Sequence, residues 1–180
     1  ARRSGSLIVE LALSELGVPY DLEEVDLAHH AQREAAYAAL NPQRKIPTLV
    51  SNSGEVLTES AAIVLTLDER HPDGGLLPPT GTAERAKALR MLLFVATEIY
   101  PIVEINDYPE RFSPDSDTAP AIREIARAIW RKRWQVVEDA IAGEPFILPS
   151  GCTVVDLYIA VVSRWAQQDE WRPGGIPKVE

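Results

Sequence analysis

Two adjacent polar residues, Glu59 and Ser60, stand where a helix is expected to begin. The strand-like residues 55–58 precede them, and the apolar periodicity of residues 61–70 predicts the helix. The first N–H groups of a helix have no intrahelical partner and carry the positive end of its dipole. Such a place binds a small carboxylate, so this helix start is the first candidate ligand site.

The segment before that helix predicts a loop and a hairpin. Pro47 has no N–H, and its place just before residues 48–50 suits the first residue of a strand. Residues 51–54, Ser-Asn-Ser-Gly, favour a tight turn because Asn and Gly adopt left-handed conformations readily. Residues 41–63 are therefore expected to form a loop, a strand, a turn, a second strand and a helix start.

In this order and spacing, the Ile46-Pro47 and Glu59-Ser60 pairs resemble the glutathione-binding half of the cytosolic glutathione S-transferases. In that family an Ile/Val-Pro pair with a cis peptide bond precedes a strand, and a Glu/Gln-Ser pair starts the next helix. The resemblance implies that the Ile46 backbone pairs with the cysteinyl backbone of glutathione beside a cis Pro47. It also implies that Glu59 holds the γ-glutamyl ammonium, while Ser60 takes its carboxylate. Taken alone, each residue favours a simpler interpretation: Pro47 is then an ordinary trans proline at the start of a strand, and Glu59 a charge near a helix N-terminus.

Two basic residues, Arg44 and Lys45, flank the Ile46-Pro47 pair. One of them, with Lys45 slightly favoured, would reach the glycine carboxylate of glutathione, since a positive side chain there would offset the acidic background. The alternative is that both are solvated loop charges.

Glutathione transfer needs a thiolate, although a free thiol has a pKa of about 8.5. A hydrogen-bond donor aimed at the sulfur lowers that pKa. Residues 7–17 and 25–28 resemble bacterial beta-type members of the family, which use a cysteine here. This chain has Gly5 at the aligned position, and its one cysteine, Cys152, lies in the other domain. The donor must therefore be another residue.

Ser4 is the first candidate for this donor and Ser6 the second, and Arg3 would assist through its charge. The family places such a donor between its first strand and first helix. The alternative role for both serines is helix N-capping, and the sequence favours neither role over the other.

Tyr100 is the candidate for the electrophile site. Beta-type relatives have a cleft histidine at the aligned position, which implies that Tyr100 contacts glutathione or the electrophile. A packing role is the alternative. Pro101 is expected to kink this helix, and Trp165 and Trp171 to be core or lining residues of the helical domain.

The fold class expected from these elements is a thioredoxin-like α/β domain followed by an all-helical domain. Residues 1–71 form the first domain, with helices at 6–17 and 32–40 and a strand at 20–25, but without the opening strand of that fold. The Pro- and Gly-rich residues 72–81 form a linker. Residues 82–180 form the helical domain that supplies the electrophile site.

Two helices anchor the second domain. Thr153 and Asp156 have capping-box spacing and start an apolar, buried helix, so their role is in folding rather than chemistry. A long helix over residues 120–142 precedes it. Its packed side is expected to contain the following apolar residues: Ile122, Ile125, Ile129, Trp130, Trp134 and Val137.

The composition argues against several classes of function. The net charge of −9 and pI near 4.9 argue against a nucleic-acid partner. The sequence contains no run of 18 apolar residues that would span a membrane. Its three histidines, at positions 29, 30 and 71, form no metal-ligand pattern with the one cysteine, so no metal site is predicted. A single cysteine fits a reducing compartment, hence the cytoplasm.

The leading hypothesis is a glutathione transferase, a detoxification-type enzyme that joins the thiolate of its cosubstrate glutathione to a small hydrophobic electrophile. The resemblance also implies a homodimer. The alternative is a non-catalytic glutathione-fold binding or regulatory protein. A thiol reductase fits poorly because the cysteine is far from the site.

Overall fold

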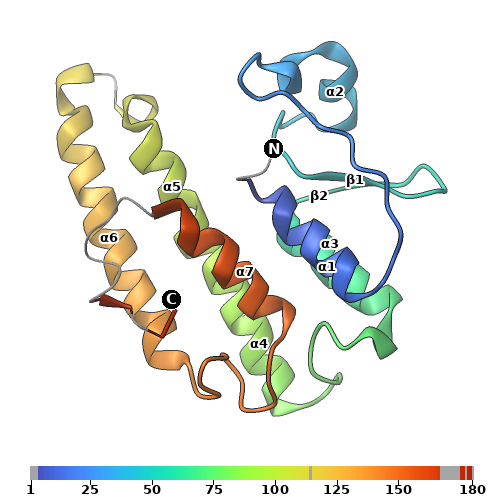
Figure 1. Ribbon diagram of the computed structural model, residues 1–180. Helices are drawn as coiled ribbons and strands as arrows, with labels where there is room; N and C mark the ends of the chain where they lie inside the picture. The colour runs from blue at the N-terminus through green and yellow to red at the C-terminus, as the bar shows by residue number, and fades with distance from the viewer. Residues whose placement is uncertain (1–3, 114, 167–174, 177, 180) are drawn as a thin grey trace. The chain divides into compact units, whose positions relative to one another are not determined.

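The computed structural model describes residues 4–113, 115–166, 175–176 and 178–179. It divides into two compact units, Ala1–Pro79 and Thr80–Glu180. Figure 1 shows strands only in the first unit and a set of long helices in the second.

The first unit is built on two packed helices and one hairpin. Its elements, in chain order, are α1 (Ser6–Glu15), a 3-10 turn (Ala31–Arg33), α2 (Ala35–Leu40), β1 (Thr48–Val50), β2 (Val56–Thr58), α3 (Ser60–Arg70) and a 3-10 turn (Pro72–Gly74). Helix α1 packs against α3, and both helices contribute buried apolar side chains, namely Ile8, Val9, Ala12, Leu13, Ile63, Val64 and Leu67.

These two helices run in the same direction. A Cβ added at Gly74, just after the end of α3, would collide with the side chain of Leu16, just after the end of α1. Because the C-terminal ends adjoin and the helices pack along their length, Ser6 and Ser60 begin the two helices at the same end of the unit (Figure 1).

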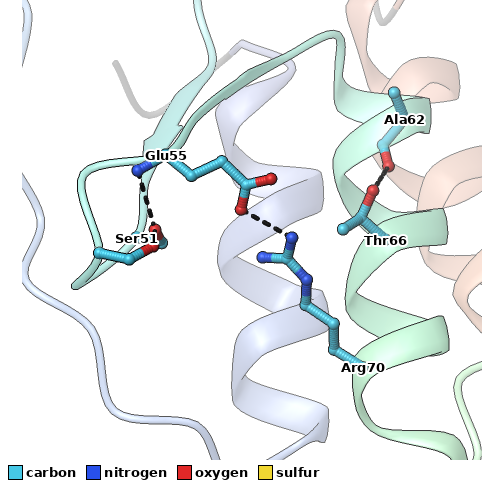
Figure 2. A network of polar contacts seen from close by, with 6 residues as sticks. Ser51, Glu55, Ala62, Thr66 and Arg70 are labelled. Carbon is cyan, nitrogen blue, oxygen red and sulfur yellow. Dashed lines mark hydrogen bonds and ion pairs between the residues drawn. The ribbon is translucent and has the colours of Figure 1, made fainter.

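The predicted hairpin is confirmed. Strands β1 and β2 pair antiparallel, with Thr48 opposite Thr58 and Val50 opposite Val56. Ser51 closes the turn by accepting a hydrogen bond from the Glu55 N–H at 3.1 Å (Figure 2).

An ion pair links the hairpin turn to α3. The Glu55 carboxylate meets the Arg70 guanidinium at 2.6 Å, as Figure 2 shows. Both side chains are more than two-fifths exposed, at 43% and 46%, so this pair contributes at most about 1 kcal/mol to stability.

Two expectations for the first unit are wrong. Residues 20–25 form no strand, because a strand requires a hydrogen-bonded neighbour and the described residues provide none beside them. The helix expected at 32–40 is interrupted at Glu34, whose ψ of 149° is extended and separates the 3-10 turn from α2.

The second unit is helical throughout its described residues. Its elements are α4 (Ala83–Phe94), a π-helical turn (Val95–Ile99), α5 (Tyr100–Asp107), 3-10 turns (Pro109–Phe112 and Ser116–Thr118), α6 (Ala119–Ala140), α7 (Val154–Ser163) and a 3-10 turn (Arg164–Ala166). Helix α5 packs against α6, and α4 packs against α7.

The packed side of α6 matches the expectation only in part. Ile125 and Ile129 are 60% and 36% exposed, so their assignment to the packed side is wrong. Trp130, Trp134 and Val137 are buried as predicted. Helix α6 buries the side that contacts α5. Ile125 and Ile129 lie outside that side, and their apolar character alone does not bury them.

The predicted capping box of α7 is confirmed. The Thr153 hydroxyl accepts from the Val155 N–H, and the Asp156 carboxylate accepts from the Thr153 N–H at 2.8 Å. Most of α7 is buried, including Val155, Tyr158 and Val162. Within the described residues, no helix is long and apolar enough to cross a bilayer.

Candidate functional site

The candidate site is the end of the hairpin where β1 begins and β2 finishes. Thr48 pairs with Thr58, so the residues before the first and after the second meet at one end of the ladder. Paired residues in an antiparallel ladder lie about 5 Å apart between their Cα atoms. The structure therefore brings Ile46-Pro47 beside Glu59-Ser60, although 11 residues separate the pairs in the chain.

The helix start has the predicted position. Helix α3 begins at Ser60, which is only 6% exposed, while Glu59 is exposed. Glu59 has a φ of +63°, a region that non-glycine residues seldom adopt and that is often found at functional sites. A carboxylate placed there would meet the positive end of α3.

The loop before β1 also has the predicted backbone. The Ile46–Pro47 peptide bond is cis, which confirms the expectation taken from the resemblance. Both residues are half-buried. Within the part of the chain that the structure describes, no hydrogen bond involves the Ile46 N–H or C=O. That backbone is therefore able to pair with an extended peptide, as a sheet edge does.

Lys45 lies beside this backbone with an exposed side chain. Its carbonyl oxygen accepts hydrogen bonds from the Tyr37 hydroxyl at 2.8 Å and the Asn41 side-chain amide at 2.7 Å. Neither of these donors was expected from the sequence. The one available signal was an Asn directly before Pro42, which is typical of a turn that follows a helix.

Ser4 and Ser6 lie at the start of α1. Their hydroxyl oxygens are 2.8 Å apart, and the Ser6 N–H donates weakly to the Ser4 hydroxyl at 3.4 Å. The Leu7 N–H donates to the Ser4 carbonyl at 3.2 Å. Because α1 and α3 are parallel, this hydroxyl pair is at the same end of the unit as Glu59 and Ser60. Arg3 lies outside the described residues.

Tyr100 occupies the second unit, at the junction of the π-helical turn and α5. Its half-buried ring meets the Trp165 ring edge to face, with centroids 4.6 Å apart. Arg133 of α6 donates to the Glu98 carbonyl in the π-helical turn and pairs with its carboxylate at 2.6 Å. π-Helical turns are frequent at functional sites. Trp171 lies outside the described residues.

The donor set suits an organic zwitterion rather than a metal ion. Among the described residues, no group of three or more His, Cys, Asp and Glu side chains is placed to hold a metal. The hairpin end instead offers one carboxylate, one helix N-terminus and one unpaired backbone segment. This combination recognises a peptide that carries both an ammonium and a carboxylate.

Comparisons with known proteins show the family of this chain. The family described as glutathione S-transferase, N-terminal domain, matches residues 6–70. The GST-like protein YncG of Escherichia coli K12 is 34% identical over 169 residues, covering 93% of this chain and 80% of YncG. The glutathione S-transferase GstA of Escherichia coli O157:H7 is 32% identical over 162 residues, covering 89% of this chain and 77% of GstA.

A solved structure extends the likeness to the fold. A sphingomonad glutathione S-transferase in complex with glutathione superposes with a TM-score of 0.76. It is 28% identical, and the match covers 98% of this chain and 85% of that one. The expected fold class, a thioredoxin-like domain followed by an all-helical domain, is confirmed.

Proposed function

Because the chain belongs to the glutathione S-transferase family, we propose that it binds glutathione at the hairpin end and transfers its thiolate to a small hydrophobic electrophile. The observation that carries this proposal is the register of the hairpin. With Thr48 opposite Thr58, Ile46-Pro47 and Glu59-Ser60 lie side by side at one end of the hairpin. In this proposal the residues assigned from sequence keep their roles.

Each part of the tripeptide has a chemically matched partner in this proposal. The Glu59 carboxylate pairs with the γ-glutamyl ammonium, and the α3 N-terminus at Ser60 binds the γ-glutamyl carboxylate. The Ile46 N–H and C=O pair with the cysteinyl backbone. Lys45 pairs with the glycine carboxylate. These contacts would fix the position of the sulfur and spare the reaction much of the entropy cost of a two-molecule encounter.

Before the attack, the thiol must lose its proton to the solvent, because the thiolate is the nucleophile. The thiolate sulfur then forms a bond to an electrophilic carbon, and a leaving group departs with its electron pair. The hydroxyl pair of Ser4 and Ser6 is suited to assist, because a hydroxyl can donate to the sulfur and the hydrogen bond between the two hydroxyls, 2.8 Å apart, polarises that donor. A donated hydrogen bond favours the thiolate and lowers the pKa of the thiol.

Binding and turnover test this function separately. Isothermal titration with S-methylglutathione measures the Kd, and absorbance with a chlorodinitrobenzene measures conjugation. We expect saturable binding and enzyme-dependent release of chloride. Absence of binding by the purified chain would contradict the proposed function.

One observation favours a second candidate, a glutathione-binding protein without turnover. By the resemblance to beta-type relatives, Gly5 stands at the position of their catalytic cysteine, and the single cysteine of this chain, Cys152, belongs to the second unit. Retention on immobilised glutathione without conjugation of any tested electrophile would favour this candidate over the enzyme.

Ser4→Ala is expected to raise the pKa of the bound glutathione thiol by about one unit, since one donated hydrogen bond is worth about 1 kcal/mol or somewhat more. The Kd for S-methylglutathione should stay within twofold, because that ligand has no ionisable thiol. Ultraviolet absorbance of the thiolate against pH measures the pKa. Ser14→Ala, at an exposed position of the same helix, is the control. An unchanged titration would contradict the role of Ser4 as the donor to the thiolate.

Tyr100→Phe tests the electrophile site. If the phenol contacts the electrophile, loss of the hydroxyl should raise the KM for the electrophile about fivefold, which corresponds to about 1 kcal/mol. The KM for glutathione should not change. Steady-state kinetics with each substrate varied in turn measures both constants, and Tyr108→Phe at an exposed site is the control. Equal constants for Tyr100→Phe and the unsubstituted protein would leave Tyr100 with a packing role only.

A further inference from the structure

The side chains of Tyr37, in α2, and of Asn41, directly after α2, hold the backbone on both sides of Ile46–Pro47. The Tyr37 hydroxyl lies 2.8 Å from the Lys45 carbonyl oxygen and 2.9 Å from the Thr48 hydroxyl. The Asn41 side-chain amide lies 2.7 Å and 3.4 Å from the same two atoms. The loop is thus tied to α2 just before the cis bond and just after it.

Asn41 is placed to hold this geometry firmly. It is only 3% exposed, and its side-chain oxygen accepts from the Gln43 N–H at 3.0 Å. Its backbone carbonyl accepts from the Arg44 N–H at 2.8 Å, which closes the turn. Arg44 has a φ of +57°, so the turn needs support from these contacts.

The contacts to the Lys45 carbonyl also orient the next N–H group. The cis bonds of the described residues are at Ile46–Pro47 and Glu144–Pro145, so the Lys45–Ile46 peptide is trans. The C=O and N–H of a planar trans peptide point in opposite directions. Since Tyr37 and Asn41 hold the Lys45 oxygen toward α2, the Ile46 N–H points away from α2. No hydrogen bond of the described residues uses that N–H.

We propose that Tyr37 and Asn41 are positioning residues that act through the Lys45 carbonyl to aim the Ile46 N–H at the cysteinyl carbonyl of glutathione. This inference rests on the proposed function. Neither side chain touches the tripeptide. Their effect is to hold the peptide plane in its binding orientation before the ligand arrives, which reduces the ordering cost of binding.

Tyr37→Phe removes one of the two donors and keeps the ring. We expect the Kd for S-methylglutathione, measured by titration calorimetry, to rise about tenfold. The KM for glutathione should rise by the same factor, while kcat at saturating glutathione and the pKa of the bound thiol stay unchanged. A variant that was merely less stable would not separate KM from kcat in this way. Tyr20→Phe, at a position that is 41% exposed, is the matched control.

Free glutamine provides a second readout, because it carries the γ-glutamyl group but no cysteinyl residue. Its weak affinity, measured by chemical-shift changes on titration, should be equal in the unsubstituted protein and in Tyr37→Phe. If Tyr37→Phe lost affinity for glutamine and for S-methylglutathione by the same factor, the substitution would have damaged the hairpin end in general, and the inference would be overturned.

Asn41→Asp is a second variant with a pH signature. An ionised carboxylate cannot donate to the Lys45 oxygen, so binding should weaken more than in Tyr37→Phe at neutral pH. A protonated carboxyl can donate, and burial raises the pKa of a carboxyl group. Affinity should therefore recover as the pH falls from 7 toward about 5, whereas the affinity of Tyr37→Phe should not.

The outcomes separate the two proposals. If the unsubstituted protein does not bind S-methylglutathione, the proposed function fails, and this inference fails with it. If that protein binds and Tyr37→Phe binds within twofold as tightly, the positioning role alone is overturned.

Discussion

Glu59→Gln is expected to raise the Kd for glutathione about thirtyfold. A hydrogen bond between charged groups contributes about 1.5–3 kcal/mol, and 1.4 kcal/mol corresponds to a factor of ten in affinity. The substitution keeps the shape of the side chain and removes only its charge. Because Glu59 is exposed, its own contribution to folding is small, and the variant should fold normally.

A ligand without the ammonium group shows whether this loss is specific. Deamino-glutathione should bind the unsubstituted protein and Glu59→Gln with equal Kd, because neither complex contains the ammonium–carboxylate pair. Titration calorimetry of both ligands with both proteins completes a double-mutant cycle.

Glu55→Gln is the matched control, since it removes a carboxylate from the same hairpin. That carboxylate pairs with Arg70 at 2.6 Å and is part of the exposed network in Figure 2. Its loss should leave the Kd unchanged. Equal Kd values for glutathione in Glu59→Gln and the unsubstituted protein would contradict the role of Glu59.

Asp156→Ala is expected to lower the free energy of unfolding by about 3 kcal/mol. Its carboxylate accepts three hydrogen bonds, from the Ile147 N–H at 2.8 Å and from the N–H and hydroxyl of Thr153 at 2.8 and 2.9 Å. Ile147 and Thr153 are buried, and each donor left without a partner costs about 1–3 kcal/mol. Urea unfolding followed by circular dichroism measures the change.

Two further measurements distinguish a folding role from a binding role. Thr153→Ala should cost less, about 1–2 kcal/mol, because it removes the cap but leaves the Asp156 contact to Ile147. Asp139→Ala removes an exposed carboxylate of α6 and should change stability by less than about 0.5 kcal/mol. All three variants should bind S-methylglutathione normally below their unfolding transitions. Unchanged stability with lost binding in Asp156→Ala would refute the folding assignment.

Features set by a few neighbouring residues were predictable from the sequence. The start of β1 after Pro47 and the turn at residues 51–54 follow from the local backbone preferences of proline, asparagine and glycine. The start of α3 at Ser60 likewise follows from nearby residues. The same holds for the Thr153–Asp156 box, whose partners are three residues apart. Together with the family resemblance, these signals indicated the fold and the candidate glutathione site.

Features that depend on distant partners were not predictable in this way. Residues 20–25 have a strand-like composition, but a strand exists only where another strand accepts its hydrogen bonds. Ile125 and Ile129 are apolar, yet the packing of α5 on α6 leaves them at the surface. Residue type states what a side chain prefers, and the packed neighbours decide whether the preference is met.

The sequence alone was enough to name the residues whose chemical groups are complementary to those of glutathione, namely Ile46-Pro47 and Glu59-Ser60. The tertiary structure alone showed that the hairpin register joins them and that parallel packing of α1 and α3 puts Ser4 and Ser6 at the same end. It also revealed that Tyr37 and Asn41 orient the Lys45 carbonyl. The reason is physical: every residue has the same backbone carbonyl, so only the folded geometry selects which one a side chain binds.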